Sequence, residues 1–299
     1  MPRPYACPVC ESNESEEVFR LRGYEVAECG SCGLRFNAGF GGGRPASEVF
    51  SREYYYVEHR NFFAAQLADG ETDLSVPTYL RRLDQIESIL GRGRLLDVGA
   101  GLGTFLRLAR DRGWNVQGVE ISPFAVDHIR RTLGVPVFQG DLGAFDAPEA
   151  SFDLVTFWDS LEHIERPRES LRRAFQLLRP GGALVLTTDN FDCLIADIVG
   201  FLYRASGGAI RYPVERLFID RNTVYFSDGY LLGLVRGLDF TEVQMTRMDA
   251  PLGKITASLI ERAALRVLYA LAALTHREAQ MTLMVRRPEN GLPGQEVLG

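Results

Sequence analysis

The sequence lacks the features that would place the chain in a membrane or on a nucleic acid. It contains no run of about 18 uninterrupted apolar residues, the length that a membrane-spanning helix needs. The N-terminal region has no basic segment followed by an apolar run, so no secretory signal is expected. Basic residues are not in surplus, since 33 Lys and Arg stand against 39 Asp and Glu. We therefore expect a cytoplasmic protein, and a nucleic-acid substrate is disfavoured because attraction to phosphates needs excess positive charge.

Length and composition predict one large domain with a small accessory module. The chain has 299 residues, of which 46% are hydrophobic and 24% charged, as in an ordinary globular protein. That length lies at the limit at which a single core stops growing. A glycine-rich break, GFGGGRP, interrupts the chain at 39–45. We divide the chain into a module with its linker over 1–45, a helical cover over 46–90 and a main domain over 91–299.

Four of the five cysteines form two Cys-x-x-Cys pairs near the N-terminus. The pairs Cys7/Cys10 and Cys29/Cys32 are separated by 18 residues, a spacing typical of a four-thiolate zinc site. Four soft thiolates suit tetrahedral Zn²⁺ and leave no open coordination position, so the expected role of the metal is structural. A redox-active pair or unliganded thiols are the alternatives. The sequence thus predicts a small zinc ribbon.

The main domain alternates short apolar runs with helical segments. Apolar runs occur at 94–99, 115–120, 135–141, 152–158 and 183–188, with helical patterns at 103–112, 123–133 and 167–178 between them. Strands separated by helices of this length indicate a parallel sheet covered on both faces. Two further runs, 240–248 and 280–287, suit a closing pair at the sheet edge. The predicted fold class is α/β, a doubly wound, mostly parallel sheet.

A glycine-rich turn after the first of these strands predicts a nucleotide-like ligand. Gly99, Gly101 and Gly103 end the strand and open a helix, where a bare backbone can approach a ligand closely. Glu120 follows 21 residues after Gly99, at the end of the next strand, where a carboxylate can bind ribose hydroxyls. A nicotinamide dinucleotide would need Gly-x-Gly-x-x-Gly. Neither register of this turn fits that pattern, and a turn without a ligand is the remaining alternative.

The ordered motifs together resemble class I S-adenosylmethionine-dependent methyltransferases. They are Asp97-x-Gly99-x-Gly101-x-Gly103, Glu120, Asp141, Trp158-Asp159 with Leu161-Glu162-His163, and Arg179-Pro180-Gly181-Gly182. The resemblance covers about 80–290. It implies a seven-stranded, Rossmann-like methyltransferase sheet whose last strand is antiparallel.

The resemblance also implies which residues hold the cofactor, S-adenosylmethionine. In the family, residues matching Asp97, Gly99 and Gly101 bind its methionine end, and those matching Glu120 bind its ribose. Asp141 and Leu142 match residues that surround the adenine, although an Asp after a strand is often a turn residue. The remaining residues that we expect to line the same site are Ala100, Gly103, Ile121 and Trp158.

The N-terminal ribbon joined to this core resembles a bacterial group that includes sugar-nucleotide C-methyltransferases. In that group the ribbon and a neighbouring Tyr-rich segment help to enclose the substrate. The sugar enzymes carry a further C-terminal domain that this shorter chain does not match. A sugar or glycan precursor is the first expectation for the acceptor.

Two residues after the fourth strand are the candidate catalytic groups. A hydroxyl, amine or acidic C–H acceptor needs a base within hydrogen-bond reach. His163 is the first candidate and Asp159 the second, although a histidine there can also be structural. Asp189 and Asn190 are expected to orient the substrate. A lid formed by Tyr54, Tyr55, Tyr56 and His59 is weighed against simple aromatic packing.

Two segments bear on partners. The segment 191–227, rich in Leu, Ile, Phe and Tyr, is expected to build the acceptor pocket as an insertion in the main domain. The segment 255–274 reads as a helix with a narrow polar stripe of Glu261, Arg262 and Arg266. Core packing or a homodimer face is the first explanation of its apolar remainder. Peripheral contact with a membrane surface is the alternative.

The sequence therefore predicts an S-adenosylmethionine-dependent enzyme that methylates a small molecule, such as a sugar nucleotide or a lipid-linked precursor. An RNA methyltransferase that uses the ribbon to bind nucleic acid is a second hypothesis, and it would be expected to show a basic stripe. A non-catalytic binding module with the same fold is a third. The atom that receives the methyl group is not specified by the sequence.

Overall fold

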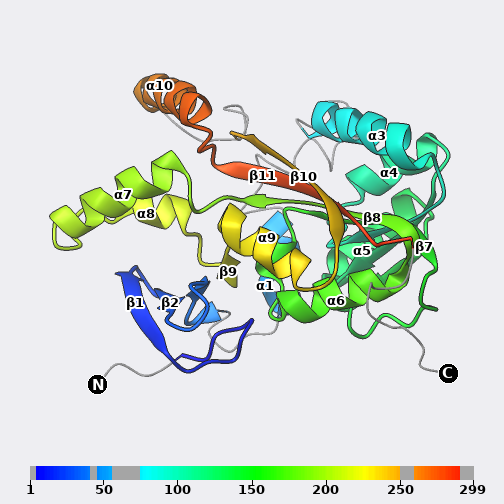
Figure 1. Cartoon of the computed structure of the whole chain (residues 1–299), viewed down its shortest axis with the longest axis horizontal. Helices are drawn as coiled ribbons and strands as arrows, with labels where there is room; N and C mark the ends of the chain where they lie inside the picture. The colour runs from blue at the N-terminus through cyan, green and yellow to red at the C-terminus, as the bar shows by residue number, and fades with distance from the viewer. Residues whose placement is uncertain (1–4, 41–45, 56–74, 250–258, 290–299) are drawn as a thin grey trace.

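The computed structural model describes residues 5–40, 46–55, 75–249 and 259–289. Two sheets organise these residues, as Figure 1 shows. The smaller sheet has four strands in the order β1-β2-β3-β9, and the larger has seven in the order β10-β11-β8-β7-β4-β5-β6. Among the described residues no helix is both long and apolar enough to cross a bilayer.

The seven-stranded sheet is parallel except at one edge. Its parallel strands are β4 (Arg94–Val98), β5 (Asn115–Glu120), β6 (Val137–Gln139), β7 (Phe152–Trp158) and β8 (Leu178–Asp189). The strand β11 (Gln280–Arg286) runs antiparallel to β8, and β10 (Thr241–Met248) runs antiparallel to β11. The predicted seven-stranded sheet with an antiparallel last strand is confirmed, because β11, the last strand in the chain, runs antiparallel to both of its neighbours.

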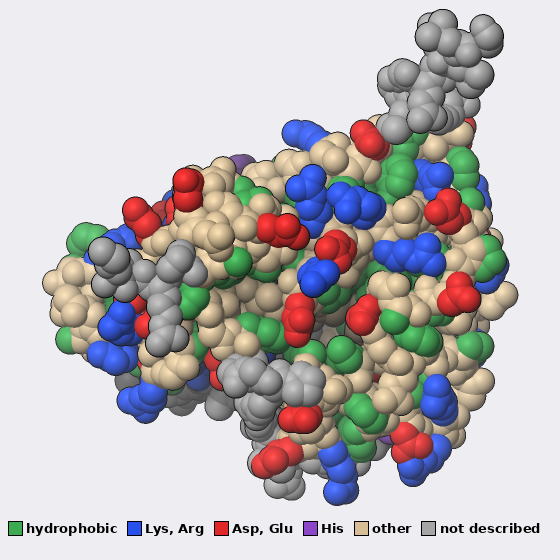
Figure 2. All heavy atoms as spheres, turned by 90° about the horizontal axis from the view of Figure 1, so that it is seen from below, with side chains coloured by type: hydrophobic (Ala, Val, Ile, Leu, Met, Phe, Trp, Pro, Cys, Tyr) green, Lys and Arg blue, Asp and Glu red, His purple; other side chains and the backbone are tan. Residues whose placement is uncertain are grey.

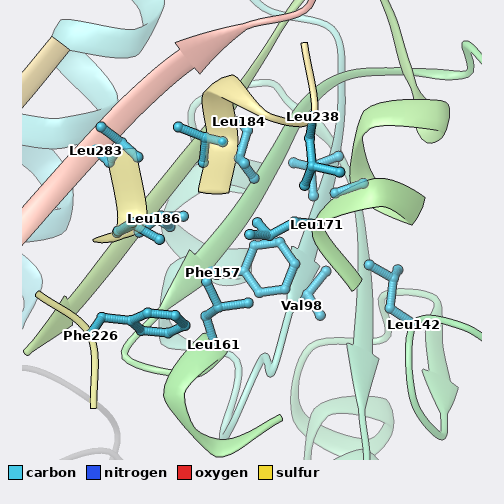
Figure 3. Packing of buried hydrophobic residues seen from close by; sticks show 14 of the residues in the cluster. Val98, Leu142, Phe157, Leu161, Leu171, Leu184, Leu186, Phe226, Leu238 and Leu283 are labelled. Carbon is cyan, nitrogen blue, oxygen red and sulfur yellow. The ribbon is translucent and has the colours of Figure 1, made fainter. Parts of the chain in front are cut away.

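Helices cover both faces of this sheet. One face packs against α3 (Val76–Leu90), α4 (Thr104–Asp111) and α5 (Pro123–Thr132). The other packs against α6 (Pro167–Leu177) and α9 (Asp228–Arg236). Parallel strands covered on two sides must be apolar throughout, as their runs of Leu, Val and Phe are. The close-up in Figure 3 shows Phe157 of β7 surrounded by aliphatic side chains from the sheet and from the neighbouring helices.

Local sequence signals set several helix ends. The side chain of Ser122 accepts a hydrogen bond from the backbone N–H of Ala125, and Pro123 occupies the first turn of α5. Ser227 caps α9 in the same way, through the N–H of Tyr230. These caps place the beginnings of both helices directly after the strands that precede them.

The small sheet combines the N-terminal module with a strand from the middle of the chain. Its first three strands are β1 (Ser15–Arg20), β2 (Glu25–Cys29) and β3 (Arg35–Asn37), all antiparallel. The fourth, β9 (Val224–Tyr225), comes from the segment that was expected to be an insertion in the main domain, and it pairs with β3. Phe19 of β1 also packs on Phe218 of that segment, with ring centroids 4.9 Å apart.

The remaining elements lie near the edge of the sheet where β7 and β8 end. They are α1 (Ala46–Val49), η3 (Leu161–His163), α7 (Leu194–Ala205), α8 (Tyr212–Leu217) and α10 (Leu259–Thr275). The elements α7, α8 and α10 project at one end of the molecule in Figure 1. Acidic and basic side chains are interspersed over the face shown in Figure 2.

Candidate functional site

The glycine turn after β4 leaves its backbone open at the carboxyl edge of the sheet. Gly99, Gly101 and Gly103 have φ values of 74°, 55° and 83°, which lie in the left-handed region that favours glycine. A Cβ on Gly99 would lie 2.5 Å from the Cβ of Ser160, and one on Gly103 would lie 2.7 Å from a methyl carbon of Leu133. A Cβ on Gly101 would meet nothing within 4 Å. The turn therefore needs glycine for packing at two positions and faces open space at the middle one.

Glu120 closes this turn from the neighbouring strand. Its carboxylate accepts the backbone N–H groups of Gly101 and Ser122, each at 2.8 Å, through different oxygens. The side chain is only 5% exposed. Burial raises the pKa of Glu120, while the N–H groups of Ser122 and Gly101 oppose that shift. Each oxygen keeps acceptor capacity, so the carboxylate can also bind hydroxyl groups of a ligand.

Asp97 is a second buried carboxylate beside the turn. It is 2% exposed, and its Oδ1 accepts a 2.7 Å hydrogen bond from the hydroxyl of Thr156. Burial and the neighbouring Glu120 raise the pKa of Asp97 to about 7, against the lowering effect of Thr156. No cationic side chain of the described residues forms an ion pair with it. A cationic group of a ligand would relieve this buried charge.

The other predicted cofactor residues lie around the same edge. The N–H of Ala100 bonds to the carbonyl of Val119 at 3.2 Å, which ties the turn to β5, and Ile121 follows Glu120 and is half-buried. Leu142 is 1% exposed and belongs to the core. Asp141 is exposed and accepts the N–H of Ala144 at 3.0 Å, as a turn residue does.

Trp158 is placed differently from the other predicted cofactor residues. Its ring packs between Tyr79 and Phe105, with centroids 5.3 and 4.8 Å away, on the face of the sheet covered by α3 and α4. The side chain is 8% exposed. A contact between its ring and the cofactor therefore stays a prediction.

Three carboxylates gather where β7 and β8 end. Asp159 has a φ of 47°, and its Oδ1 accepts Nε2 of Gln280 at 3.2 Å. Burial and the charges of Asp159 and Asp189 raise the pKa of Glu162 well above its usual value. Burial and Asp159 raise the pKa of Asp189 to about 7. Because neighbouring like charges disfavour simultaneous ionisation, Glu162 and Asp189 favour their protonated forms more than ordinary carboxyl groups do.

His163 lies in η3, immediately beyond this acidic group. Its Nδ1 is 3.1 Å from the backbone carbonyl oxygen of Arg221, and its ring lies 5.4 Å from that of Phe50. A carbonyl can only accept, so Nδ1 carries the hydrogen and Nε2 carries the lone pair in the neutral ring. The contact therefore holds the tautomer whose Nε2 can take a proton.

Two aromatic side chains from the segment after α1, Tyr54 and Tyr55, are within electrostatic reach of the carboxylates. The ring of Tyr54 packs edge-on against Tyr55, with centroids 5.0 Å apart, and the guanidinium of Arg221 lies 5.3 Å from the centroid of the Tyr54 ring. Burial raises the pKa of Tyr54 to about 12, with Arg221 lowering it and Glu120, Glu162 and Asp159 raising it. Tyr54 is thus near both Glu120 and the acidic group, as a lid would be. The other lid candidates, Tyr56 and His59, lie outside the described residues.

Asn190, expected to orient the substrate, is used within the fold. Its side chain is 2% exposed, donates to the carbonyl of Glu278 at 3.1 Å and accepts the N–H of Asp192 at the same distance. Of the two residues expected to orient the substrate, Asp189 and Asn190, it is Asp189 that belongs to the acidic group.

The expected insertion contributes residues that the sequence alone did not single out. The N–H of Thr223 donates to the carbonyl of Glu162 at 2.8 Å, and its hydroxyl donates to that of His163 at 3.1 Å. The carbonyl of Thr223 accepts the N–H of Asn37 in β3, at 3.0 Å. No local pattern marks Thr223 or Arg221, since their partners in η3, two carbonyls and the Nδ1 of His163, lie about 60 residues away. The four-stranded sheet, which contains β3, is thereby joined to the turn that carries His163.

The four N-terminal cysteines come together as the spacing predicted. Their Sγ atoms all lie within 4.8 Å of one another, with Cys7 and Cys32 at 3.7 Å and Cys10 and Cys29 at 3.5 Å. Tetrahedral Zn–S bonds of about 2.3 Å give sulfur separations of about 3.8 Å, close to these distances. Burial acts to raise the pKa of Cys29, yet hydrogen bonds from Cys32, Cys10 and Ser31 lower it to about 7. The donor set fits a tetrahedral metal ion.

A family comparison matches residues 52–244 to a model described as a methyltransferase domain. The chain belongs to this methyltransferase family. The match spans the glycine turn, Glu120 and the turn that carries His163, so the predicted resemblance is confirmed.

Similar proteins agree with this assignment. The methyltransferase is 32% identical over 132 residues to a ubiquinone biosynthesis O-methyltransferase of Azoarcus sp. (strain BH72), a match covering 41% of this chain and 57% of that protein. It is also 32% identical over 102 residues to the mitochondrial enzyme of the same name from Schizosaccharomyces pombe, covering 32% of this chain and 37% of the other. The chain thus spans about half or less of the length of these relatives.

Solved structures share the fold. A SAM-dependent methyltransferase from Archaeoglobus fulgidus aligns with a TM-score of 0.53 at 18% identity, covering 78% of this chain and 99% of that one. Phosphoethanolamine N-methyltransferase 2 of Haemonchus contortus, in complex with S-adenosyl-L-methionine, aligns with a TM-score of 0.56 at 15% identity, covering 79% and 58%. At such identities the likeness establishes the class I methyltransferase fold and leaves the substrate open.

The metal site generates one prediction. Replacing Cys29→Ser removes a thiolate from a four-coordinate site, so the protein should lose bound metal and its melting temperature should fall. Metal content by mass spectrometry and thermal unfolding are the measurements. The control is Cys193→Ser, because Cys193 only caps α7 through the N–H of Ala196, a role that serine also fills. Equal metal content in the two variants would contradict the site.

Proposed function

We propose that the protein transfers a methyl group from S-adenosylmethionine to a hydroxyl group of a small-molecule acceptor. The observation that supports this most is the position of two arrangements at one sheet edge. The open backbone of Gly101 with Glu120 and Asp97 forms one, and His163 with its fixed tautomer forms the other. The first suits a charged nucleoside-like cofactor, and the second suits an acceptor that must lose a proton.

The residues present fit the proposed cofactor. Glu120 is oriented by two N–H groups and can accept hydrogen bonds from ribose hydroxyls. Asp97 is a buried carboxylate whose charge would be matched by the amino group of the cofactor. Gly101 leaves space for close approach to the backbone. When bound, the cofactor supplies an electrophilic methyl group on a sulfonium sulfur.

His163 is the proposed general base. An acceptor hydroxyl that received the methyl group would have to release its proton. Nε2 of His163 takes that proton, and the carbonyl of Arg221 holds the ring through Nδ1 in both protonation states. Tyr54 and Tyr55 help to exclude water from the reacting groups.

The acidic group favours a polyhydroxylated acceptor. Asp159, Glu162 and Asp189 together offer carboxyl oxygens that can accept and, when protonated, donate hydrogen bonds to hydroxyl groups. This supports a sugar nucleotide or a glycan or lipid-linked precursor as the acceptor. The printed names of the relatives, which denote O-methyltransferases, support oxygen as the atom methylated. The ion in the four-cysteine site is proposed to be structural Zn²⁺.

The cofactor site is tested by Glu120→Ala. We expect the affinity for S-adenosylhomocysteine, measured by calorimetry, to fall below detection because the variant loses both the ribose acceptor and the support of the Gly101 N–H. Circular dichroism should show that the sheet is retained. The matched control is Glu169→Ala, because Glu169 is an exposed residue of α6, and this variant should bind normally. An unchanged affinity in the Glu120 variant would refute the placement of the cofactor.

Cofactor binding should also depend on pH through Asp97. Its pKa in the free protein is raised to about 7, so the carboxyl is mostly neutral below that pH, and pairing with a cation requires it to lose a proton. The affinity for S-adenosylhomocysteine should therefore rise with pH, about tenfold from one pH unit below this pKa to well above it. Calorimetry at a series of pH values measures this. Asp97→Asn should bind weakly with a flatter profile, and a parallel profile in that variant would exclude Asp97 as the source.

The base is tested by His163→Ala. Turnover with a hydroxyl acceptor, followed as release of S-adenosylhomocysteine, should fall by about 10²–10⁴-fold, while the cofactor dissociation constant stays the same. His276→Asn is the control, because His276 is exposed, has a φ of 54° that asparagine tolerates, and lies beyond α10. Unchanged turnover in the alanine variant would remove His163 from the mechanism and leave Asp159 as the next candidate.

A further inference from the structure

Helix α7 is apolar on the face turned away from the protein as well as on the packed face. Ala196, Val199 and Gly200 are buried, whereas Phe201 and Leu202 are 65% and 37% exposed. A surface helix of a soluble domain normally presents polar side chains to water. Packing within the chain therefore explains only one face of α7.

The exposed apolar side chains are concentrated at this end of the molecule. Of the eight large hydrophobic residues that are exposed in the described part of the chain, seven belong to α7, α8, α10 or the turn between α7 and α8. The seven are Phe201, Leu202, Ile210, Tyr212, Val267, Leu271 and Leu274. Scattered single exposures are normal, but such clustering marks an interaction surface.

The helices that carry these residues are joined to one another. Arg277, just after α10, forms a 2.8 Å ion pair with Asp197 of α7, and its carbonyl accepts the N–H of Leu194 at 3.0 Å. Figure 1 shows α7, α8 and α10 projecting at the same end. Core packing or a homodimer face was the first explanation from sequence for the apolar part of this helix. Val267 and Leu274 are 61% and 79% exposed, so core packing does not account for the outer face of α10.

Basic side chains accompany the apolar ones. Arg204, Arg211 and Arg216 are exposed along α7 and α8. Over 194–217 the acidic residues are Asp197, which pairs with Arg277 at 2.8 Å, and Glu215, whose carboxylate accepts the backbone N–H of Arg22 at 3.0 Å. With Arg277 counted, four arginines stand against these two acidic residues at this end of a chain whose net charge is −6. We call the seven apolar residues and the arginines Arg204, Arg211 and Arg216 the apolar-arginine surface.

The combination of apolar and positive groups selects the partner. In a symmetric dimer the same patch would face itself, which would bring the exposed arginines of two copies together with the paired Asp197 and Glu215 as their only acidic neighbours over 194–217. A nucleic acid would match the charge but not the apolar side chains. An anionic lipid bilayer matches both, because apolar side chains enter the boundary between headgroups and acyl chains while arginines contact lipid phosphates.

The apolar-arginine surface adjoins the acceptor side of the site. Helix α10 ends at Thr275, five residues before Gln280 at the start of β11. Gln280 pairs with Asp189 of β8, and its Nε2 donates to Oδ1 of Asp159 at 3.2 Å. The end of α10 therefore adjoins the acidic group where β7 and β8 end.

We propose that the apolar-arginine surface docks the protein on the surface of anionic membranes. Docking is independent of methyl transfer. The consequence for the substrate rests on the proposed function: docking would bring the acceptor side next to the bilayer and make lipid-linked acceptors the favoured class. The contact is peripheral, in keeping with the lack of a membrane-spanning helix among the described residues.

The test is co-sedimentation of the full chain with vesicles, without cofactor or acceptor. Vesicles of phosphatidylcholine should bind little, and vesicles with about a third phosphatidylglycerol should bind the protein and release it as salt increases. The triple variant Phe201→Gln, Val267→Gln, Leu274→Gln should lose most of this binding. Arg204→Gln and Arg211→Gln should each weaken it by about fivefold.

Matched controls carry the same substitutions elsewhere. Ile89→Gln alters the remaining exposed apolar residue, in α3, and Arg131→Gln alters an exposed arginine of α5, so both should bind vesicles normally. Unchanged affinity for S-adenosylhomocysteine verifies that each variant is folded and separates this test from that of the proposed function. Equal binding to neutral and anionic vesicles, or full binding by the triple variant, would overturn the proposal. The proposal would also be overturned if the protein bound no vesicles and instead formed a dimer that the triple variant no longer forms.

Discussion

The hydrogen bonds of the Glu120 carboxylate organise the edge of the sheet on which the rest of the site depends. One oxygen holds the Gly101 N–H and the other holds the Ser122 N–H, so a single side chain fixes both the turn after β4 and the start of α5. The arrangement keeps a carboxylate out of water beside the equally buried Asp97. Such a pair is unfavourable until a ligand supplies hydroxyl donors and positive charge. The two buried carboxylates at this edge are therefore electrostatically complementary to a cationic nucleoside.

A second constraint ties the acceptor side to the N-terminal module. Thr223 bonds to two consecutive residues of η3 through its N–H and its hydroxyl, and its carbonyl bonds to Asn37 of the ribbon sheet. The orientation of His163 is set from the same segment, through the carbonyl of Arg221. The ribbon strands and the segment after β8 thus form one support for the turn that carries His163. The expected division at 45 separates two parts that share a sheet.

The sequence was informative wherever the chemistry is local. Alternating apolar runs sufficed for the parallel sheet, and the glycine turn and the acidic residue one strand later sufficed to place Gly101 and Glu120 together, because the ends of parallel strands meet at one edge. The spacing of Cys7, Cys10, Cys29 and Cys32 likewise sufficed to predict that their four sulfur atoms come together.

What the sequence could not supply depends on contacts between distant segments. The pairing of β9 with β3 joins residues almost 190 positions apart, and a two-residue strand carries no pattern of its own. The roles of Arg221 and Thr223 rest on backbone groups, which any residue type could present, and on the Thr223 hydroxyl, whose partner lies 60 residues away. The position of Trp158, packed by Tyr79 and Phe105, follows from the helices above it rather than from its motif.

The shared sheet also limits how this architecture can be rearranged. The strand β9 and the aromatic rings of Phe218 and Tyr225 are covered by the ribbon strands, including Phe19. Deleting the ribbon as a cassette would leave an unpaired strand edge flanked by bare aromatic rings, which is a template for aggregation. Exchange of N-terminal modules between such proteins would have to carry the segment around β9 with it. The ribbon strands and the segment around β9 are distant in the sequence but form a single structural unit.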